Sequence, residues 1–178
     1  MSSFSSTENR AGVGYGFGIA DTGSTQGPYQ LGTIIRAQDG EASSALGVGE
    51  FIYLKSNATE VLGSLVTYNP KEGTTTLTTT SGKNTGQPVA VSMAAKAAGQ
   101  YGFYQIGGVA NMAKGVVDFG LASPVYTSTS TAGYVTATAG SGNQILGAIT
   151  ANAASVSSTT SLIYVTIDRP HLSGISNA

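Results

Sequence analysis

The stretch Gly49-Glu-Phe-Ile-Tyr-Leu-Lys55 decides the fold class of this chain. Its large side chains alternate, with Phe51 and Tyr53 on one face and Ile52 and Leu54 on the other. A period of two predicts a β-strand, because successive side chains of an extended chain point to opposite faces.

The same alternation recurs along the rest of the chain in short runs bounded by Gly, Pro or Asn, which is typical of strands joined by turns. The segments Asn69-Pro-Lys-Glu-Gly73 and Ser81–Gly86 are predicted turns, since proline presets φ and glycine accepts a positive φ. We therefore expect an all-β fold, a β-sandwich or barrel of the jelly-roll kind. The further predicted strands include Leu65–Tyr68, Val89–Ala94, Tyr101–Ile106 and Leu162–Ile167.

Helical signals are few. Met93–Ala98 could form a turn or two of helix before Gly99 ends it, and Ala110–Lys114 is similar. We expect less than about a fifth of the residues to be helical. The threonine-rich segment Thr74–Thr80 suits an exposed edge strand, where β-branched side chains are favoured and their hydroxyls stay hydrated.

Residues 1–45 have a different character from residues 46–178, which we expect to form the β-sandwich or barrel domain. The run Gly12–Gly18 alternates glycine with Val13, Tyr15 and Phe17. Glycine loses much backbone entropy on ordering, so this run favours an extended N-terminal arm laid along another protein. The alternative is a strand whose glycine face packs beneath a neighbouring sheet.

The composition limits the partners that the chain can have. Only 10% of the residues are charged, the net charge is −1, and 40% are hydrophobic, so the chain is expected to fold. Without a basic excess there is no source of attraction to nucleic acid, and a net charge near zero favours association with other proteins. No secretory signal or membrane-spanning segment is recognisable, so assembly in a bacterial cytoplasm is expected.

Sequence patterns of catalysis are missing. His171 is the only histidine and cysteine is absent, so no two-histidine or thiolate metal site is expected. The sequence contains no serine-hydrolase elbow, dinucleotide fingerprint or phosphate loop. Asp39 and Glu41 are the closest carboxylate pair on a predicted strand or turn, and we interpret them as solvated turn residues. We expect a non-enzymatic protein without cofactor or metal, although any two carboxylates could form a glycosidase pair in space.

Several segments, taken in order, resemble a series seen in small β-rich virion proteins, the head decoration (cement) proteins of tailed bacteriophages. The ordered set, rather than any single motif, carries this resemblance over residues 36 to 170. The resemblance implies a protein of the capsid exterior that binds the major capsid protein and stabilises the assembled capsid by bridging its subunits. The segments are Gly49–Lys55, Gly63-Ser-Leu-Val-Thr-Tyr68, Val89–Ala95, Gly99–Gly107 and Val165-Thr-Ile-Asp-Arg-Pro170.

Five residues of the N-terminal arm are the candidate contacts with the capsid. Tyr15, Phe17 and Tyr29 are expected to fill apolar pockets, and Arg10 and Arg36 to pair with capsid carboxylates. A homo-oligomer, a dimer or trimer, would match a symmetric shell. The main alternative is a receptor- or glycan-binding β-domain of a fibre or adhesin, and a small hydrolase is the third.

Overall fold

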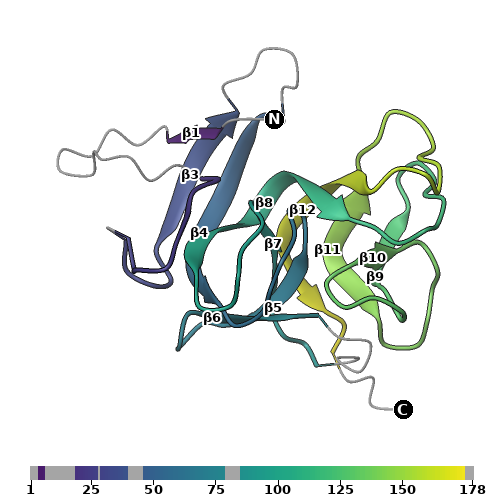
Figure 1. Ribbon diagram of the computed structural model, residues 1–178. Helices are drawn as coiled ribbons and strands as arrows, with labels where there is room; N and C mark the ends of the chain where they lie inside the picture. The colour runs from purple at the N-terminus through teal and green to yellow at the C-terminus, as the bar shows by residue number, and fades with distance from the viewer. Residues whose placement is uncertain (1–3, 7–18, 28, 40–45, 79–84, 175–178) are drawn as a thin grey trace.

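The computed structural model describes residues 4–6, 19–27, 29–39, 46–78 and 85–174, and these contain strands but no helix. The predicted all-β class is therefore confirmed (Figure 1). One mixed sheet joins all 12 strands. They are β1 (Phe4–Ser6), β2 (Thr22–Gly23), β3 (Ile34–Asp39), β4 (Val48–Ser56), β5 (Leu65–Asn69), β6 (Thr74–Leu77), β7 (Val89–Ser92), β8 (Tyr101–Ala113), β9 (Pro124–Thr127), β10 (Val135–Thr136), β11 (Gln144–Thr150) and β12 (Leu162–Leu172).

Five strands close into a first barrel in the order β4-β6-β5-β7-β8, because β8 also pairs with β4. The β4–β6 contact is parallel and the other four contacts are antiparallel. β6 is therefore an internal strand and Thr75 is fully buried, so the predicted exposed edge strand at Thr74–Thr80 is wrong. The apolar part of the barrel interior consists of Ile52, Leu54, Val66, Ala90, Tyr104 and Ile106.

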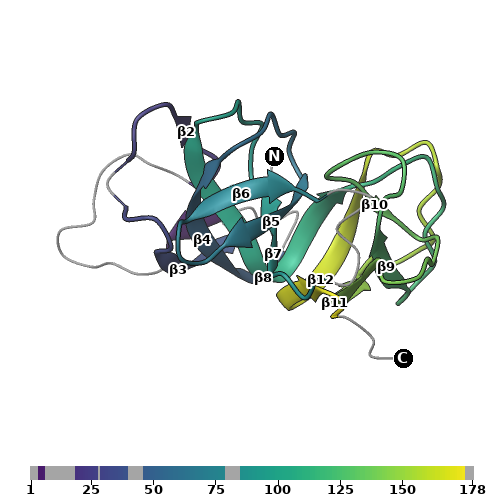
Figure 2. The ribbon, with the colours of Figure 1, turned by 90° about the horizontal axis from the view of Figure 1, so that it is seen from below.

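A second barrel lies beside the first and shares β8 with it (Figure 2). Its order is β8-β12-β11-β9-β10, and a parallel bridge between Lys114 and Val135 closes the ring. Its interior is apolar and includes the large side chains Met112, Phe119, Ile145, Ile163 and Ile167.

The two barrels have the same topology. In each, the first strand is parallel to the third and antiparallel to the last, and the second strand pairs with the third and the fourth. The links outside the strands match as well. Glu60 pairs with Lys96 in the first barrel as Phe119 pairs with Val156 in the second, each through two backbone hydrogen bonds. The fold is therefore a structural duplication in which β8 ends one barrel and begins the other.

A bend at Gly107–Gly108 allows β8 to serve both barrels. Residues up to Gly107 pair with β4, and residues from Gly107 onward pair with β12. The β4–β8 register shifts here, and Gly108 has φ +92°. A Cβ on Gly108 would lie 2.6 Å from the backbone oxygen of Val48. This position needs glycine for both its conformation and the close approach of β4.

Strand β7 and the first two residues of β5 separate the two cores and are buried on both faces. Val66 and Ala90 point into the first barrel, whereas Leu65, Val89 and Val91 join the core of the second. A third apolar cluster lies on the outer face of β4 and β8, where Phe51, Tyr53 and Phe103 are fully buried. Ile19, Tyr29, Leu31, Ile35 and Ala37 cover this cluster, so much of the region 19–39 packs against the first barrel.

The predicted short helices do not form. Lys96, within Met93–Ala98, is held in an extended bridge to Glu60, and Ala110–Lys114 continues β8 and ends in the bridge to Val135. Pairing with distant strands overrides the weak helix preference of alanine. The turn at Asn69–Gly73 is confirmed, because the Gly73 amide donates to the Asn69 carbonyl at 2.8 Å. Most of the predicted turn Ser81–Gly86 lies outside the described residues.

The bend gives a prediction about stability. Gly108→Ala should lower the free energy of unfolding by about 2 kcal/mol more than Gly99→Ala. Gly99 has a similar positive φ of +87°, but a Cβ added to it would have no atom within 4 Å, so its substitution isolates the conformational cost. Urea unfolding of both variants provides the measurement. Equal losses would show that the approach of β4 to Gly108 does not constrain the fold.

Candidate functional site

The structure describes two of the five residues predicted to contact a capsid. Arg10, Tyr15 and Phe17 lie outside the described residues, so their role stays a prediction. Tyr29 packs within the outer aromatic cluster, with its ring centroid 5.0 Å from that of Phe103 and 5.5 Å from that of Tyr53. Part of its apolar surface is therefore already used inside the chain.

Arg36 takes part in an ion-pair bridge across three strands. Its Nη2 lies 2.7 Å from Oε1 of Glu50 on β4, and Arg169 Nη2 on β12 lies 2.7 Å from Oε2 of the same carboxylate. The hydrogen bond from Arg36 is the main cause that lowers the pKa of Glu50. Arg36 remains 67% exposed, so any partner carboxylate would share this guanidinium with Glu50. Exposed pairs of this kind add little stability.

The backbone of β12 directs Arg169 toward Glu50. Arg169 has φ +44°, which is unusual for a residue with a side chain. The β11–β12 register shifts across Gly147, where a Cβ would lie 2.6 Å from the Asp168 carbonyl oxygen. A bulge of this type re-aims a side chain that would otherwise follow the regular alternation.

The most concentrated set of chemical groups is buried inside the first barrel. The Glu60 carboxylate is only 2% exposed and accepts hydrogen bonds from four hydroxyl groups. Tyr104 Oη lies 2.9 Å from Oε2, and Ser92 Oγ also donates to Oε2, at 2.9 Å. Ser56 Oγ and Thr75 Oγ1 donate to Oε1, at 2.8 and 2.9 Å. The carboxylate is thus bound from β4, β6, β7 and β8, so it ties the barrel together from within.

Lys96 is the cationic member of this cluster. It is 3% exposed, its Nζ donates to Ser92 Oγ at 2.8 Å, and it lies 4.2 Å from the centroid of the Tyr104 ring. Burial lowers the pKa of Lys96 to about 8, against the opposing effect of Glu60. Burial and the nearby Glu60 charge raise the pKa of Tyr104.

A carboxylate, an amine and a phenol in contact could support proton transfer in an accessible site. Here each of these groups is almost completely shielded, and the hydroxyl donors are directed at Glu60. Two open hollows on the described surface, one around Tyr164 and one beside Glu50, are lined by neither Glu60 nor Lys96. The arrangement is therefore that of an internal polar network.

Sequence reasoning missed this cluster. The sequence pattern predicts a helical turn around Lys96, and Glu60 is one of several scattered carboxylates. One weak signal is present, because Glu60 and Lys96 each stand three residues before a glycine, Gly63 and Gly99, that has a positive φ. The matching positions of the second barrel, Phe119 and Val156, belong to or pack against its apolar core.

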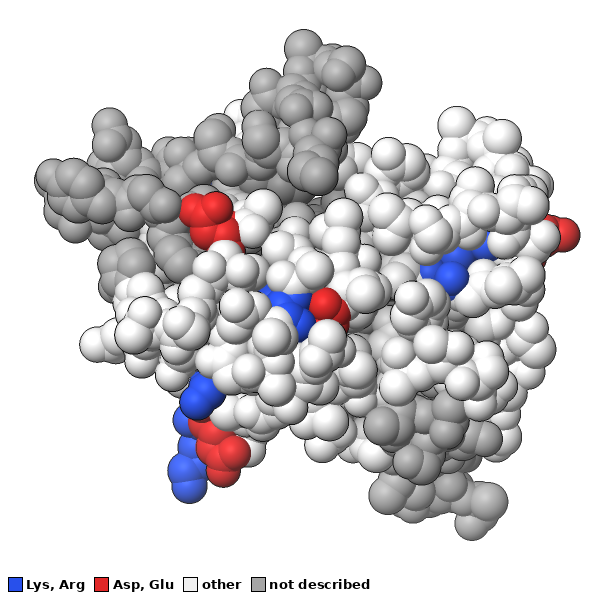
Figure 3. All heavy atoms as spheres, in the orientation of Figure 1, with Lys and Arg blue, Asp and Glu red and all other residues white. Residues whose placement is uncertain are grey.

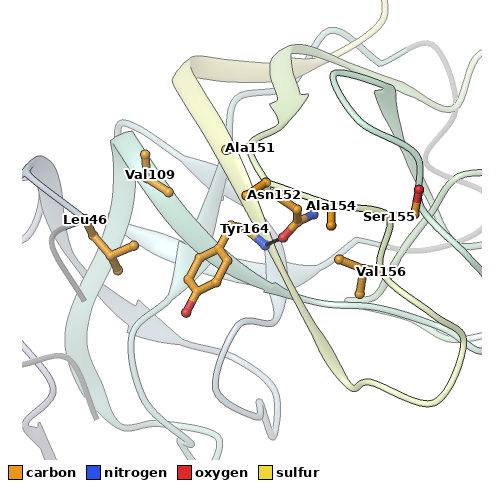
Figure 4. A pocket seen from close by; sticks show the side chains of 9 residues that line it. Leu46, Val109, Ala151, Asn152, Ala154, Ser155, Val156 and Tyr164 are labelled. Atoms are coloured by element: carbon orange, nitrogen blue, oxygen red, sulfur yellow. Dashed lines mark hydrogen bonds between the residues drawn. The ribbon is translucent and has the colours of Figure 1, made fainter. Parts of the chain in front are cut away.

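The two surface hollows differ in their lining. One, of about 520 Å³, is lined mainly by small or apolar residues around Tyr164, together with Leu46, Val109 and the segment 151–156 (Figure 4). Asn152 accepts a hydrogen bond from the Tyr164 amide at 3.1 Å, while its own buried Nδ2 has no partner among the residues that the structure describes. The other, of about 510 Å³, lies beside the Glu50 bridge over Gly107 and Gly108.

Charge is sparse on the visible face of the molecule, where most described side chains are uncharged (Figure 3). Within the described residues there is no group of three acidic, histidine or cysteine side chains that could hold a metal ion. The same described residues contain no helix that is long and apolar enough to cross a membrane. His171 is exposed and has its Nδ1 3.4 Å from the Arg169 carbonyl oxygen.

Comparisons of the chain with family models, with curated proteins and with solved structures give no match.

The Glu60 network gives a second prediction. Glu60→Leu should lower the free energy of unfolding by about 3–5 kcal/mol, because four hydroxyls and Lys96 lose a buried anionic partner. Glu72→Leu is the matched control, since Glu72 is exposed in the turn before β6 and its substitution should cost less than about 0.5 kcal/mol. Denaturant titrations measure both. A loss below about 1 kcal/mol in Glu60→Leu would contradict the assigned role.

Lys96 gives a prediction about pH. Its pKa in the folded chain is about 8, below the ordinary 10.5, so the unfolded chain binds more protons between these values. Stability contributed by Lys96 should therefore rise with pH, by on the order of 2 kcal/mol from pH 8 to pH 10. Above about pH 10, tyrosine ionisation in the unfolded chain opposes this rise, because the pKa of Tyr104 is raised in the fold. Burial also lowers the pKa of Lys114, so unfolding titrations should show a larger rise in the native chain than in Lys96→Met, and equal rises would contradict the role of Lys96.

Proposed function

We propose that this chain is a non-enzymatic decoration protein of a tailed bacteriophage, which binds the outside of the assembled capsid and stabilises it by bridging capsid subunits. The ordered sequence resemblance over residues 36 to 170 supports this proposal. The single structural observation that supports it best is a surface with few charges on which large apolar side chains are exposed. Among the described residues these are Ile34, Val48, Val61, Leu62, Val116, Leu121, Ile149 and Tyr164.

A surface of this kind suits permanent association with another protein. Exposed apolar side chains and low net charge favour burial against a partner and provide little repulsion between molecules. The groups best suited to chemistry, Glu60, Lys96 and Tyr104, are turned inward and bind one another. Adhesion needs no access to such groups, whereas catalysis does.

The mechanism is one of selective binding. A protein that binds only the assembled shell stabilises that state by mass action. Contacts with several subunits at once raise the effective affinity without new chemistry. Residues 1–45, including Arg10, Tyr15, Phe17, Tyr29 and Arg36, are proposed to contribute to anchoring, and a dimer or trimer would match the shell symmetry.

Binding to capsids tests the proposal directly. The native chain should sediment with undecorated heads assembled from the cognate major capsid protein and raise their disruption temperature, but should not bind the free capsid protein with comparable affinity. A chain lacking residues 1–18 keeps Ile19 and Tyr29 in the outer cluster, so it should fold and bind heads at least about 10-fold more weakly. Absence of native binding to heads would contradict the proposed function, and unchanged binding of the truncated chain would contradict the role of the arm.

A glycan-binding module is the second candidate. The hollow around Tyr164 favours it, because an exposed aromatic ring stands beside Asn152, whose side-chain Nδ2 has no hydrogen-bond partner among the described residues. Such a combination can stack on a sugar ring and donate to a hydroxyl. Glycan binding that is lost in Tyr164→Ala, without binding to heads, would favour this function over the first.

A further inference from the structure

The duplicated fold contains two equivalent connections, each of which links the first strand of a barrel to the second. The first connection is residues 57–64, between β4 and β5, and the second is residues 114–123, between β8 and β9. Each connection contains one residue of the backbone bridges described above, Glu60 in the first and Phe119 in the second. Three residues later the backbone has a positive φ, at Gly63 in the first and at Ala122 in the second. The hydrogen bonds that follow also match. Ser92 N donates to the Ser64 carbonyl at 2.9 Å, as Thr150 N does to that of Ser123 at 3.0 Å.

Both connections expose aliphatic side chains at the same place. Leu62 and Leu121 each stand two residues after the bridge residue and are 41% and 55% exposed. Val61 in the first connection is 44% exposed and Val116 in the second is 87% exposed. These four residues are half of the eight large apolar side chains exposed on the described part of the chain.

The turn itself does not require these apolar residues. The other residue of each bridge, Lys96 in the first barrel and Val156 in the second, is also followed by a turn. At the matching positions these turns carry Ala97-Ala98 and Ser157-Ser158, which are small or polar. The exposed leucines are therefore particular to the two equivalent connections.

Hydrogen bonds hold both connections in place before any partner binds. In the first, Val61 N donates to Ser64 Oγ at 3.0 Å. In the second, buried Lys114 donates from Nζ to the Val117 carbonyl at 2.8 Å, and Asp118 accepts from Ser158 N at 2.5 Å. A side chain presented by an ordered backbone loses little entropy on docking.

We infer that the first and second connections are two copies of one contact, through which a single chain binds equivalent apolar sites on two neighbouring capsid subunits. This inference rests on the proposed function and specifies the surface that carries it. A partner that repeats in a lattice offers the same apolar site twice, whereas a single partner molecule offers it once. The charged groups of the two connections are used internally, since Glu60 is buried and Asp118 is hydrogen-bonded, so the partner surface is expected to be apolar.

Leucine substitutions at the two connections test this inference. Leu62→Ser and Leu121→Ser should each weaken binding to undecorated heads by about 10-fold or more, and the double variant by at least about 100-fold. Val116→Ser, at the most exposed position, should weaken binding in the same direction. Ala98→Ser is the matched control, because Ala98 is exposed and stands two residues after the bridge residue Lys96, as Leu62 does after Glu60, but lies outside both connections. Far-UV circular dichroism and thermal unfolding check that all variants fold like the native chain.

The outcomes separate this inference from the proposed function. If the native chain binds heads and the leucine variants bind equally well, the inference is wrong while the decoration function stands. Loss of binding in only one of the two single variants also overturns it, because a second equivalent contact would then be absent. If the native chain does not bind heads, both proposals fall.

Discussion

The double membership of β8 in two closed barrels is the constraint on which the rest of the fold depends. A strand can change partners only where its backbone bends, and the bend at Gly107–Gly108 brings β4 so close that no Cβ could be accommodated at Gly108. Before the bend β8 closes the first barrel against β4, and after it β8 opens the second against β12. Neither ring is complete without its half of this strand, so the two barrels form one continuous structure rather than two independent domains joined by a linker.

The two barrels have the same topology but carry different kinds of side chain at equivalent positions. In each barrel a backbone bridge outside the strands joins two residues. These are Glu60 and Lys96 in the first barrel, and Phe119 and Val156 in the second. Apolar side chains fill the second interior without directional demands. The first needs a complete set of donors around one carboxylate, and Ser92 and Tyr104 are among those that supply it. A buried network of this kind tolerates few alternative arrangements, so it favours one register of the surrounding strands over others.

The strands could be predicted from the sequence because alternation is a local property, as in Phe51–Leu54. A sandwich or barrel was expected, but the two closed rings that share β8 could not be predicted, because closure depends on distant pairs such as Lys114 and Val135. Burial on both faces of β7 hides its inward and outward sides, and the threonines of β6 indicate an edge where both sides are in fact paired. The two barrels also share a pattern of backbone hydrogen bonds between distant segments, which local alternation does not predict. Tyr29 and Arg36 stay predicted contacts, and the sequence did not indicate the partners that they have within the chain, such as Phe103 and Glu50.

The distribution of side chains between interior and surface connects the fold with the proposed function. A chain with so few charges would ordinarily place them outside for solubility, yet Glu60, Lys96 and Lys114 are all nearly inaccessible. Lys114 donates to the carbonyl groups of Gly115 and Val117 on either side of Val116. A buried charge therefore holds the loop that exposes the apolar Val116 side chain. Exposing aliphatic side chains to water is unfavourable in free energy. Ordering the loop that carries them costs backbone conformational entropy in addition. Both costs are recovered only when a partner covers the surface, and binding to a capsid, as proposed, would provide such a partner.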